Sequence, residues 1–188
     1  MQIVSEEERV VQFPAASAAF KWAEEFLSRY PVESQIGKIM RGPPGEFSRD
    51  ELKDQALLIV KLVSRVEPAR VSLVFRYVYG REDQIVQQDL MDALMRHLYE
   101  VVPGARGKHG PRMMMFVRSA AEGFRRYRQF GRKQSHSRIA GDIGMARQSF
   151  SEGHWPDLIG AARGGLKTWL EVGEKWIGDE LKDRGFVA

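Results

Sequence analysis

The chain has 188 residues, of which 43% are hydrophobic and 29% charged, a composition typical of globular proteins and not of disordered chains. Cysteine is absent, which excludes disulfides and thiolate metal sites and fits a reducing compartment. No run approaches the roughly 18 apolar residues of a membrane span, and the acidic N-terminus is unlike a signal peptide. We therefore expect a cytoplasmic protein that does not bind membranes.

Positive charge is concentrated in one part of the chain. Residues 104–138 carry ten lysines and arginines against a single acid, Glu122, so this segment has a net charge of +9. Because the whole chain sums to +4, the remainder is acidic, at −5. A clustered positive field favours a polyanionic partner. The alternative is the solvated face of a basic helix, although such faces usually mix both signs.

Helical periodicity dominates the N-terminal half. Apolar residues at three- and four-residue spacings predict a helix over residues 14–30, which ends before Pro31. The Gly- and Pro-rich residues 37–47 predict a loop. Ser48 followed by Glu51 has the spacing of a capping box, which indicates that a second helix begins there.

Two further helices are predicted before the basic segment. We expect Pro68 at the first position of a helix that ends at Gly80, because proline needs no N–H there. The β-branched and aromatic residues of this stretch leave a buried strand as the alternative. A long amphipathic helix is predicted over residues 81–102, before Pro103 and Gly104.

The C-terminal half is also predicted to be helical, so the fold class is mainly α, a multi-helix bundle with a C-terminal helix-turn-helix. A basic loop at residues 104–112 precedes a helix over 113–130, and a Trp-rich amphipathic helix over 164–186 closes the chain. The loop is the best domain boundary. It separates an N-terminal helical domain, residues 1–103, from a basic DNA-binding region, residues 104–188.

Residues 137–155, SRIAGDIGMARQSFSEGHW, fit the interior of a DNA-reading helix-turn-helix. Ala140 supplies the small residue where the helices cross, and Gly144, four residues later, supplies the positive φ of the turn. Gly153 stands where an aliphatic residue would close the second helix, and Trp155 is a candidate replacement. The apolar frame consists of Ile139, Ile143, Met145 and Phe150. The alternative is a tight corner between packed helices that binds nothing.

Under the DNA-binding hypothesis, the second helix covers about residues 146–152 and presents polar side chains to the major groove. Arginine and glutamine make bidentate contacts with guanine and adenine, and the first residues of a recognition helix touch bases. The predicted base-reading residues are Arg147, Gln148 and Ser151. The predicted phosphate-binding residues are Arg125, Arg126, Arg128, Arg132, Lys133, Arg138 and Ser149.

The stretch FRRYRQFGRK, residues 124–133, interleaves arginines with aromatic residues, a pattern that can stack the bases of single-stranded nucleic acid. The favoured interpretation is a helix in which Phe124, Tyr127 and Phe130 pack inward while the arginines face solvent or phosphate. Elsewhere, the four histidines lack metal-ligand spacing, and neither a phosphate-binding loop nor a nucleophile motif occurs. We expect no enzyme activity, no metal and no cofactor.

The pattern at residues 137–155, followed by LKTWLEVGEKWIGDEL, resembles phage late-gene antiterminator proteins and related phage transcription regulators, loosely over residues 70–185. The resemblance implies a protein that binds double-stranded DNA at a late promoter and acts with RNA polymerase, with Arg147, Gln148 and Ser151 as readers. Some relatives carry a zinc site, which this cysteine-free chain cannot build from thiolates.

The sequence thus predicts a sequence-specific DNA-binding transcription regulator encoded by a phage or prophage, with antitermination as one mode of action. Two alternatives remain open. One is a helical interaction protein that inhibits or adapts a host enzyme, and the other is a DNA-packaging subunit. The sequence leaves monomer and dimer equally open.

Overall fold

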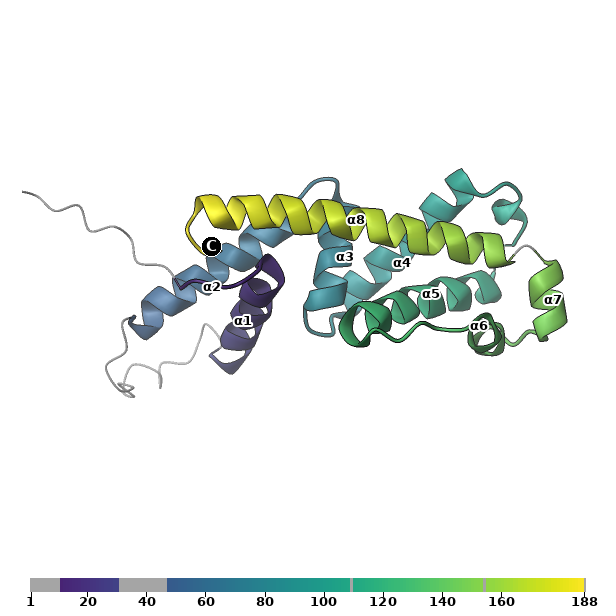
Figure 1. Ribbon diagram of the computed structural model, residues 1–188, viewed down its shortest axis with the longest axis horizontal. Helices are drawn as coiled ribbons and strands as arrows, with labels where there is room; N and C mark the ends of the chain where they lie inside the picture. The colour runs from purple at the N-terminus through teal and green to yellow at the C-terminus, as the bar shows by residue number, and fades with distance from the viewer. Residues whose placement is uncertain (1–10, 31–46, 109, 154, 188) are drawn as a thin grey trace, which may run out of the picture.

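The computed structural model describes residues 11–30, 47–108, 110–153 and 155–187. These residues form a mainly α-helical fold, as predicted (Figure 1). The predicted loop at residues 37–47 lies almost wholly outside the described residues. The helices are α1 (Ala16–Arg29), α2 (Arg49–Ser64), α3 (Ala69–Tyr79), α4 (Gln84–Val101), α5 (Pro111–Phe130), α6 (His136–Asp142), α7 (Arg147–Glu152) and α8 (Trp155–Asp183), with a short 3-10 helix, η2 (Ala105–Lys108), between α4 and α5.

Local hydrogen bonds define where the helices begin. The Ser48 Oγ accepts from the Glu51 N–H at 3.2 Å and the Glu51 carboxylate accepts from the Ser48 N–H at 2.5 Å, so the predicted capping box is confirmed. Pro68 was expected inside α3 but precedes it, because its ψ of 153° is extended and not helical. The α4 helix begins at Gln84, later than predicted, because the Asp83 carboxylate caps it.

The α3 segment is a helix, so the alternative of a buried strand is wrong. Its core positions include Val71, Val74, Phe75 and Val78, which recur at three- and four-residue spacings and are all buried. Branched and aromatic side chains lower helix propensity only slightly, and packing of this apolar stripe outweighs the difference.

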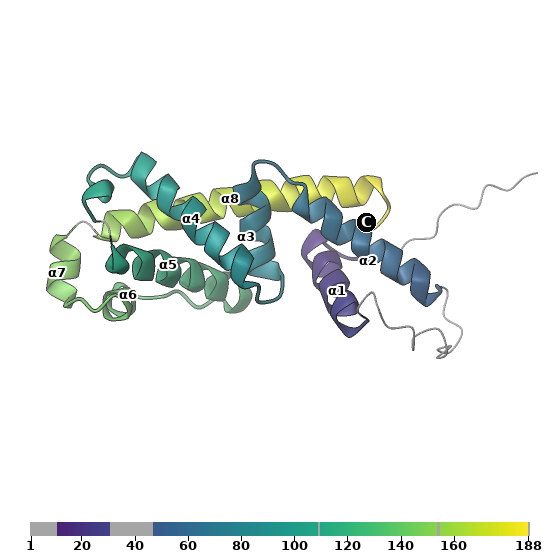
Figure 2. The same ribbon diagram turned by 180° about the vertical axis from the view of Figure 1, so that it is seen from behind.

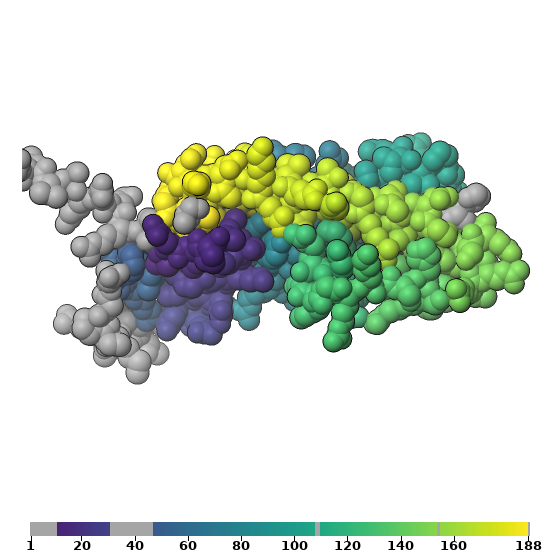
Figure 3. All heavy atoms as spheres, viewed as in Figure 1, coloured from purple at the N-terminus to yellow at the C-terminus, as the bar shows by residue number. Residues whose placement is uncertain are grey.

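The last helix, α8, organises the molecule. Its 29 residues extend over about 43 Å at about 1.5 Å per residue and run along most of the length of the fold (Figures 1 and 2). It contacts α3, α4 and α5 along its middle, α1 and α2 towards its C-terminal end, and α7 at its N-terminal end. In the space-filling view, α1 and α5 lie against it at different points (Figure 3).

The α8 helix begins at Trp155, earlier than the predicted start at residue 164. Glycines at positions 160, 164 and 165 weaken the local helical signal, because each costs up to about 1 kcal/mol relative to alanine. Tertiary packing overrides this preference. Gly165 touches His97 of α4 so closely that an added Cβ would lie 2.7 Å from the imidazole Nε2.

One continuous hydrophobic core contains residues from α1 to α8. Packing between α4 and α5, and between α8 and both α3 and α4, joins the segments before and after residue 103. The predicted division into residues 1–103 and 104–188 stays a prediction. Among the helices of the described residues, none has the length and apolar character needed to cross a bilayer.

Candidate nucleic-acid interface

A tight turn joins the short helices α6 and α7. Gly144 has a φ of +66°, which favours glycine, and this confirms the predicted conformation of the turn. The Gly144 N–H donates to the Gly141 carbonyl at 3.0 Å, and the Met145 N–H donates to the Ala140 carbonyl at 2.9 Å. These two bonds are those of a Schellman motif, which satisfies the last carbonyl groups of α6.

The predicted apolar frame holds this pair of helices against the rest of the protein. Ile139, Ala140, Ile143 and Phe150 are buried, and Met145 is partly buried against the same core. The small residue and the large ones therefore occupy the interior positions that the sequence pattern predicted for them.

Trp155 explains why glycine stands at position 153. The Trp155 indole is buried and stacks on Phe150, with ring centroids 6.1 Å apart and planes 15° apart, and it also contacts Phe116. A Cβ at Gly153 would lie 2.9 Å from the Ser149 carbonyl and 3.0 Å from the Trp155 Cδ1. An aliphatic side chain at 153 has no room, and Trp155 covers the end of α7 instead.

A polar network that sequence analysis missed locks α6 onto α5. The Ser119 hydroxyl donates to the Asp142 carboxylate at 2.5 Å, and the Gln134 amide donates to both Ser119 and Asp142, at 2.8 Å and 3.1 Å. Arg163 of α8 donates to the Gln134 carbonyl at 2.8 Å. Gly123 leaves the space that Gln134 fills, since a Cβ there would overlap the amide oxygen. In the sequence, Gly123 inside a predicted helix was the signal that another segment approaches the helix closely there.

The outer face of α7 is polar and lies at one extremity of the molecule (Figures 1 and 2). The predicted base-reading residues Arg147, Gln148 and Ser151 are all exposed, as is Ser149. The Gln148 amide donates to the Glu152 carboxylate at 2.9 Å along the helix. For the Arg147 guanidinium, the described part of the chain offers no ion-pair partner, so its charge faces solvent.

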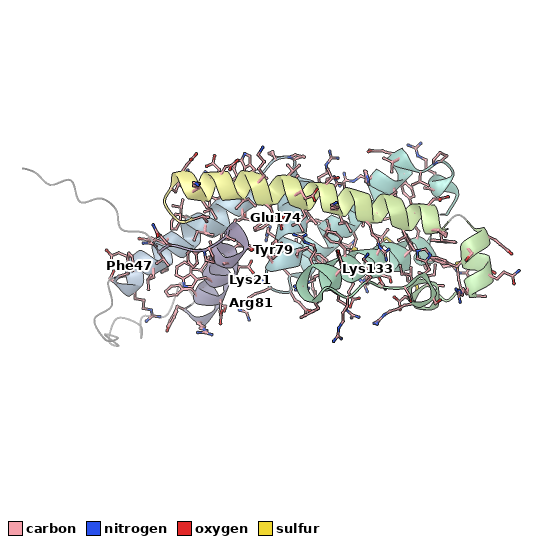
Figure 4. The ribbon with its side chains drawn as sticks, in the orientation of Figure 1. Lys21, Phe47, Tyr79, Arg81, Lys133 and Glu174 are labelled. Carbon is pink, nitrogen blue, oxygen red and sulfur yellow. The ribbon has the colours of Figure 1, made fainter. Side chains whose placement is uncertain are left out.

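Two of the predicted phosphate-binding arginines bind the protein itself. Arg128 of α5 pairs with the Glu174 carboxylate of α8 at 2.6 Å and donates to the Tyr79 hydroxyl at 3.2 Å. Glu174 of α8 and Tyr79 at the end of α3 lie next to each other (Figure 4), and the Tyr79 hydroxyl donates to the Glu174 carboxylate. Arg125 lies 5.3 Å above the Tyr77 ring and donates to a carbonyl at the end of α3. These contacts favour a packing role for both arginines.

The favoured arrangement of the three aromatic residues on α5 is wrong for two of them. Phe124 is buried, but Tyr127 and Phe130 are 43% and 69% exposed. At about 100° per residue, Tyr127 and Phe130 are rotated about 60° and 120° from Phe124, whereas Arg128 is rotated only about 40°. In the helical turn after Phe124, Arg128 is therefore the residue that faces the protein interior.

The other predicted phosphate-binding cations surround a hollow of about 510 Å³ at the C-terminal end of α5, which we call the basic hollow. Arg132, Lys133 and Arg138 are exposed, and Arg126 pairs along the helix with Glu122. Lys133 lies beside α5 (Figure 4), and its ammonium is 5.9 Å from the centre of the Tyr127 ring. The lining residues are Glu122, Gly123, Arg126, Phe130, Arg132, Lys133, Gln134, Ser135 and Arg138.

Within the described ranges, no group of three or more histidine, aspartate or glutamate side chains could hold a metal ion. The chain matches no protein-family model, no curated protein and no solved structure. Its candidate function therefore depends on the geometry of α6, α7 and the basic hollow.

Proposed function

We propose that this protein is a sequence-specific DNA-binding transcription regulator that reads double-stranded DNA with α6 and α7 as a helix-turn-helix. The observation that carries the proposal is the pairing of a rigid interior with a polar exterior. The Gly144 turn, buried Phe150 and Trp155 hold α7 in place, while Arg147, Gln148 and Ser151 face solvent.

The dimensions of α7 suit a recognition helix. An α-helix with its side chains is about 10–12 Å in diameter, which fits a major groove about 12 Å wide, and the six residues of α7 form fewer than two turns. Arg147 and Gln148 stand at the start of the helix, where side chains reach base edges. Ser151, one turn further along, offers a hydroxyl group that can donate to or accept from a base.

Exposed cations directly before α6 and in its first turn supply the phosphate contacts of this proposal. Arg132, Lys133 and Arg138 are exposed, and no acidic side chain among the described residues pairs with them. Each phosphate that a cation neutralises releases counterions from DNA, which makes binding depend on salt concentration. Arg126 and Ser149 complete the phosphate-binding set, and Arg125 and Arg128 are assigned to packing.

The resemblance to phage antiterminators extends the proposal to a phage or prophage origin and to RNA polymerase as the protein partner. Outside residues 104–138 the chain has a net charge of −5. In α1 and in α2, however, acidic and basic side chains are equal in number. We assign these two helices to contact with the polymerase on the resemblance, and not on their charge.

Selection of bound sequences from a random DNA pool tests the proposal. An enriched site is expected, and its affinity should fall steeply with salt. In Arg147→Ala we expect a loss of about 1–3 kcal/mol confined to one base pair. In Arg132→Gln we expect a uniform loss and a shallower salt dependence. Arg65→Ala, at the exposed arginine that directly follows α2, is the matched control.

The same experiments can overturn the proposal. A footprint of Arg147→Ala identical to that of the unaltered protein would remove α7 as the reader. Absence of DNA binding at low salt would favour a helical interaction protein. A solution mass far above that of a dimer would favour a ring-forming DNA-packaging subunit.

A further inference from the structure

We infer that the basic hollow at the end of α5 binds an unpaired nucleotide, with Phe130 stacking on the base and Arg132, Lys133 and Arg138 binding the phosphates. The ligand is single-stranded nucleic acid. This site lies on α5, on the segment before α6 and on Arg138 of α6. It shares its cations with the phosphate contacts proposed for the duplex, whereas Phe130 is separate from the base-reading residues of α7.

The exposed aromatic side chain is the first observation. Phe130 is 69% exposed and forms part of the wall of the hollow, and Tyr127, one turn earlier on the same helix, is 43% exposed. Two large rings on one turn of a helix leave apolar surface in water. Such rings offer flat faces on which bases stack, and each stacked base stabilises a complex independently of its sequence.

The charges around Phe130 are the second observation. The lining of the hollow contains four cationic side chains and one carboxylate, Glu122, which is already paired with Arg126. The other three cations, Arg132, Lys133 and Arg138, have no acidic partner in the described part of the chain. A positive surface beside an exposed ring is the combination that single-stranded nucleic acid requires.

The course of the backbone brings the Phe130 ring close to the cations that follow it in the chain. Gly131 ends α5 with a φ of +68°, and this left-handed turn reverses the chain directly after Phe130. The network of Gln134 with Ser119 and Asp142 then holds the returning segment against α5. The volume of about 510 Å³ lies within the range of about 300–1,000 Å³ for small-molecule sites.

The ring distinguishes a single strand from a duplex. Phosphates of both forms would bind the cations, so the cations alone do not select a single strand. In a duplex, however, each base is stacked between its neighbours, so its face is not accessible until the base is unpaired or flipped. Phe130 therefore predicts a preference for unpaired nucleotides that the cations alone would not produce.

Fluorescence anisotropy with the full chain tests this inference. The probes are a short labelled oligothymidine, an oligouridine of equal length and a duplex of equal length and unrelated sequence, each at low and at physiological salt. Phe130→Ala should weaken binding of the single strands about 5- to 140-fold, the fold-change that corresponds to one stacked base. It should leave duplex binding and the salt dependence unchanged.

Three variants control the interpretation. Phe130→Trp keeps a flat aromatic face and should retain binding, whereas Lys133→Gln should reduce the salt dependence for the single strands. Ile85→Ala removes another apolar side chain that is 73% exposed, on α4, and should change nothing. Tighter binding of oligothymidine or of oligouridine supports the site in either case and identifies the natural strand as DNA or RNA.

Two results would overturn the inference. One is single-strand affinity in Phe130→Ala equal to that of the unaltered protein. The other is an equal loss for single strand and duplex, which would make Phe130 part of a general phosphate-binding surface. Failure of the proposed transcriptional function has a different signature. On the duplex site selected from the random pool, Arg147→Ala would then bind like the unaltered protein, while Phe130→Ala would still lose single-strand binding.

Discussion

Gly141 of α6 and Gly144 of the turn that follows it should respond in opposite directions to replacement by alanine. Gly144 has a φ of +66° and Gly141 lies within α6, and an added Cβ would meet no atom within 4 Å at either position. Steric overlap therefore plays no part, and the backbone conformation alone decides the result. Gly144→Ala places an L-residue in the left-handed region, which costs about 1–2 kcal/mol. Gly141→Ala improves helix propensity by about 0.5–1 kcal/mol.

These free energies convert into measurable shifts. For a chain of this length, about 1 kcal/mol moves the melting temperature by about 2–4 °C. Gly144→Ala should therefore lower it by about 2–8 °C, and Gly141→Ala should raise it by about 1–4 °C, as followed by circular dichroism. A local measurement is amide exchange at Met145, whose N–H bonds to Ala140 across the turn. Gly144→Ala should accelerate this exchange about 5- to 30-fold.

The reasoning would be refuted if both alanine variants shifted stability in the same direction, or if Gly144→Ala exchanged at the rate of the unaltered protein. Gly144→Asn provides a further control. Asparagine tolerates the left-handed region better than alanine does, so its cost should be smaller than that of alanine.

Three further outcomes follow from the packing of the core. Gly165→Ala should lower the free energy of unfolding in urea by about 1–3 kcal/mol, because its Cβ would overlap the His97 ring. Gly164→Ala, at an exposed position, should not lower it. Equal effects of the two substitutions would contradict the overlap. Burial lowers the pKa of His97, so the unfolded chain binds a proton more readily and stability should fall as the pH drops below about 6.5. His97→Gln should flatten that loss, and an unchanged pH profile would exclude His97 as its source. Trp155→Ala should lower the free energy of unfolding by about 3–5 kcal/mol in chemical denaturation. A loss of about 0.5 kcal/mol or less, the range of surface substitutions, would show that Trp155 does not support Phe150.

The helical elements could be predicted because each carries a short-range signal. The capping box at Ser48, the glycine at the end of α3 and the apolar spacing along α5 all act within a few residues. The turn at Gly144 is equally local, because positive φ and the Schellman bonds involve only α6 and the residues directly after it. The exposure of Arg147 and Gln148 could be predicted because the helical period that turns Phe150 towards the core turns these two side chains outward.

Sequence reasoning could not assign the partners of side chains that depend on distant segments. Arg128 faces inward because Tyr79 and Glu174, on two other helices, converge on it. The Gln134 network depends on the position of Ser119 across the α5–α6 junction. The charge and polarity of a side chain can be read from the sequence, but its hydrogen-bond and ion-pair partners depend on tertiary packing.

The sequence by itself determined that the chain is helical, that a glycine turn joins two short helices and that positive charge is concentrated in the segment before that turn. These properties depend on composition and local periodicity. Only the tertiary structure decided that Trp155 closes α7 where Gly153 leaves no room, and that Phe130 is exposed while Arg128 is engaged. The physical reason is that burial is a relation between segments. A helix has one period, but the neighbouring helices determine which part of each turn meets the core.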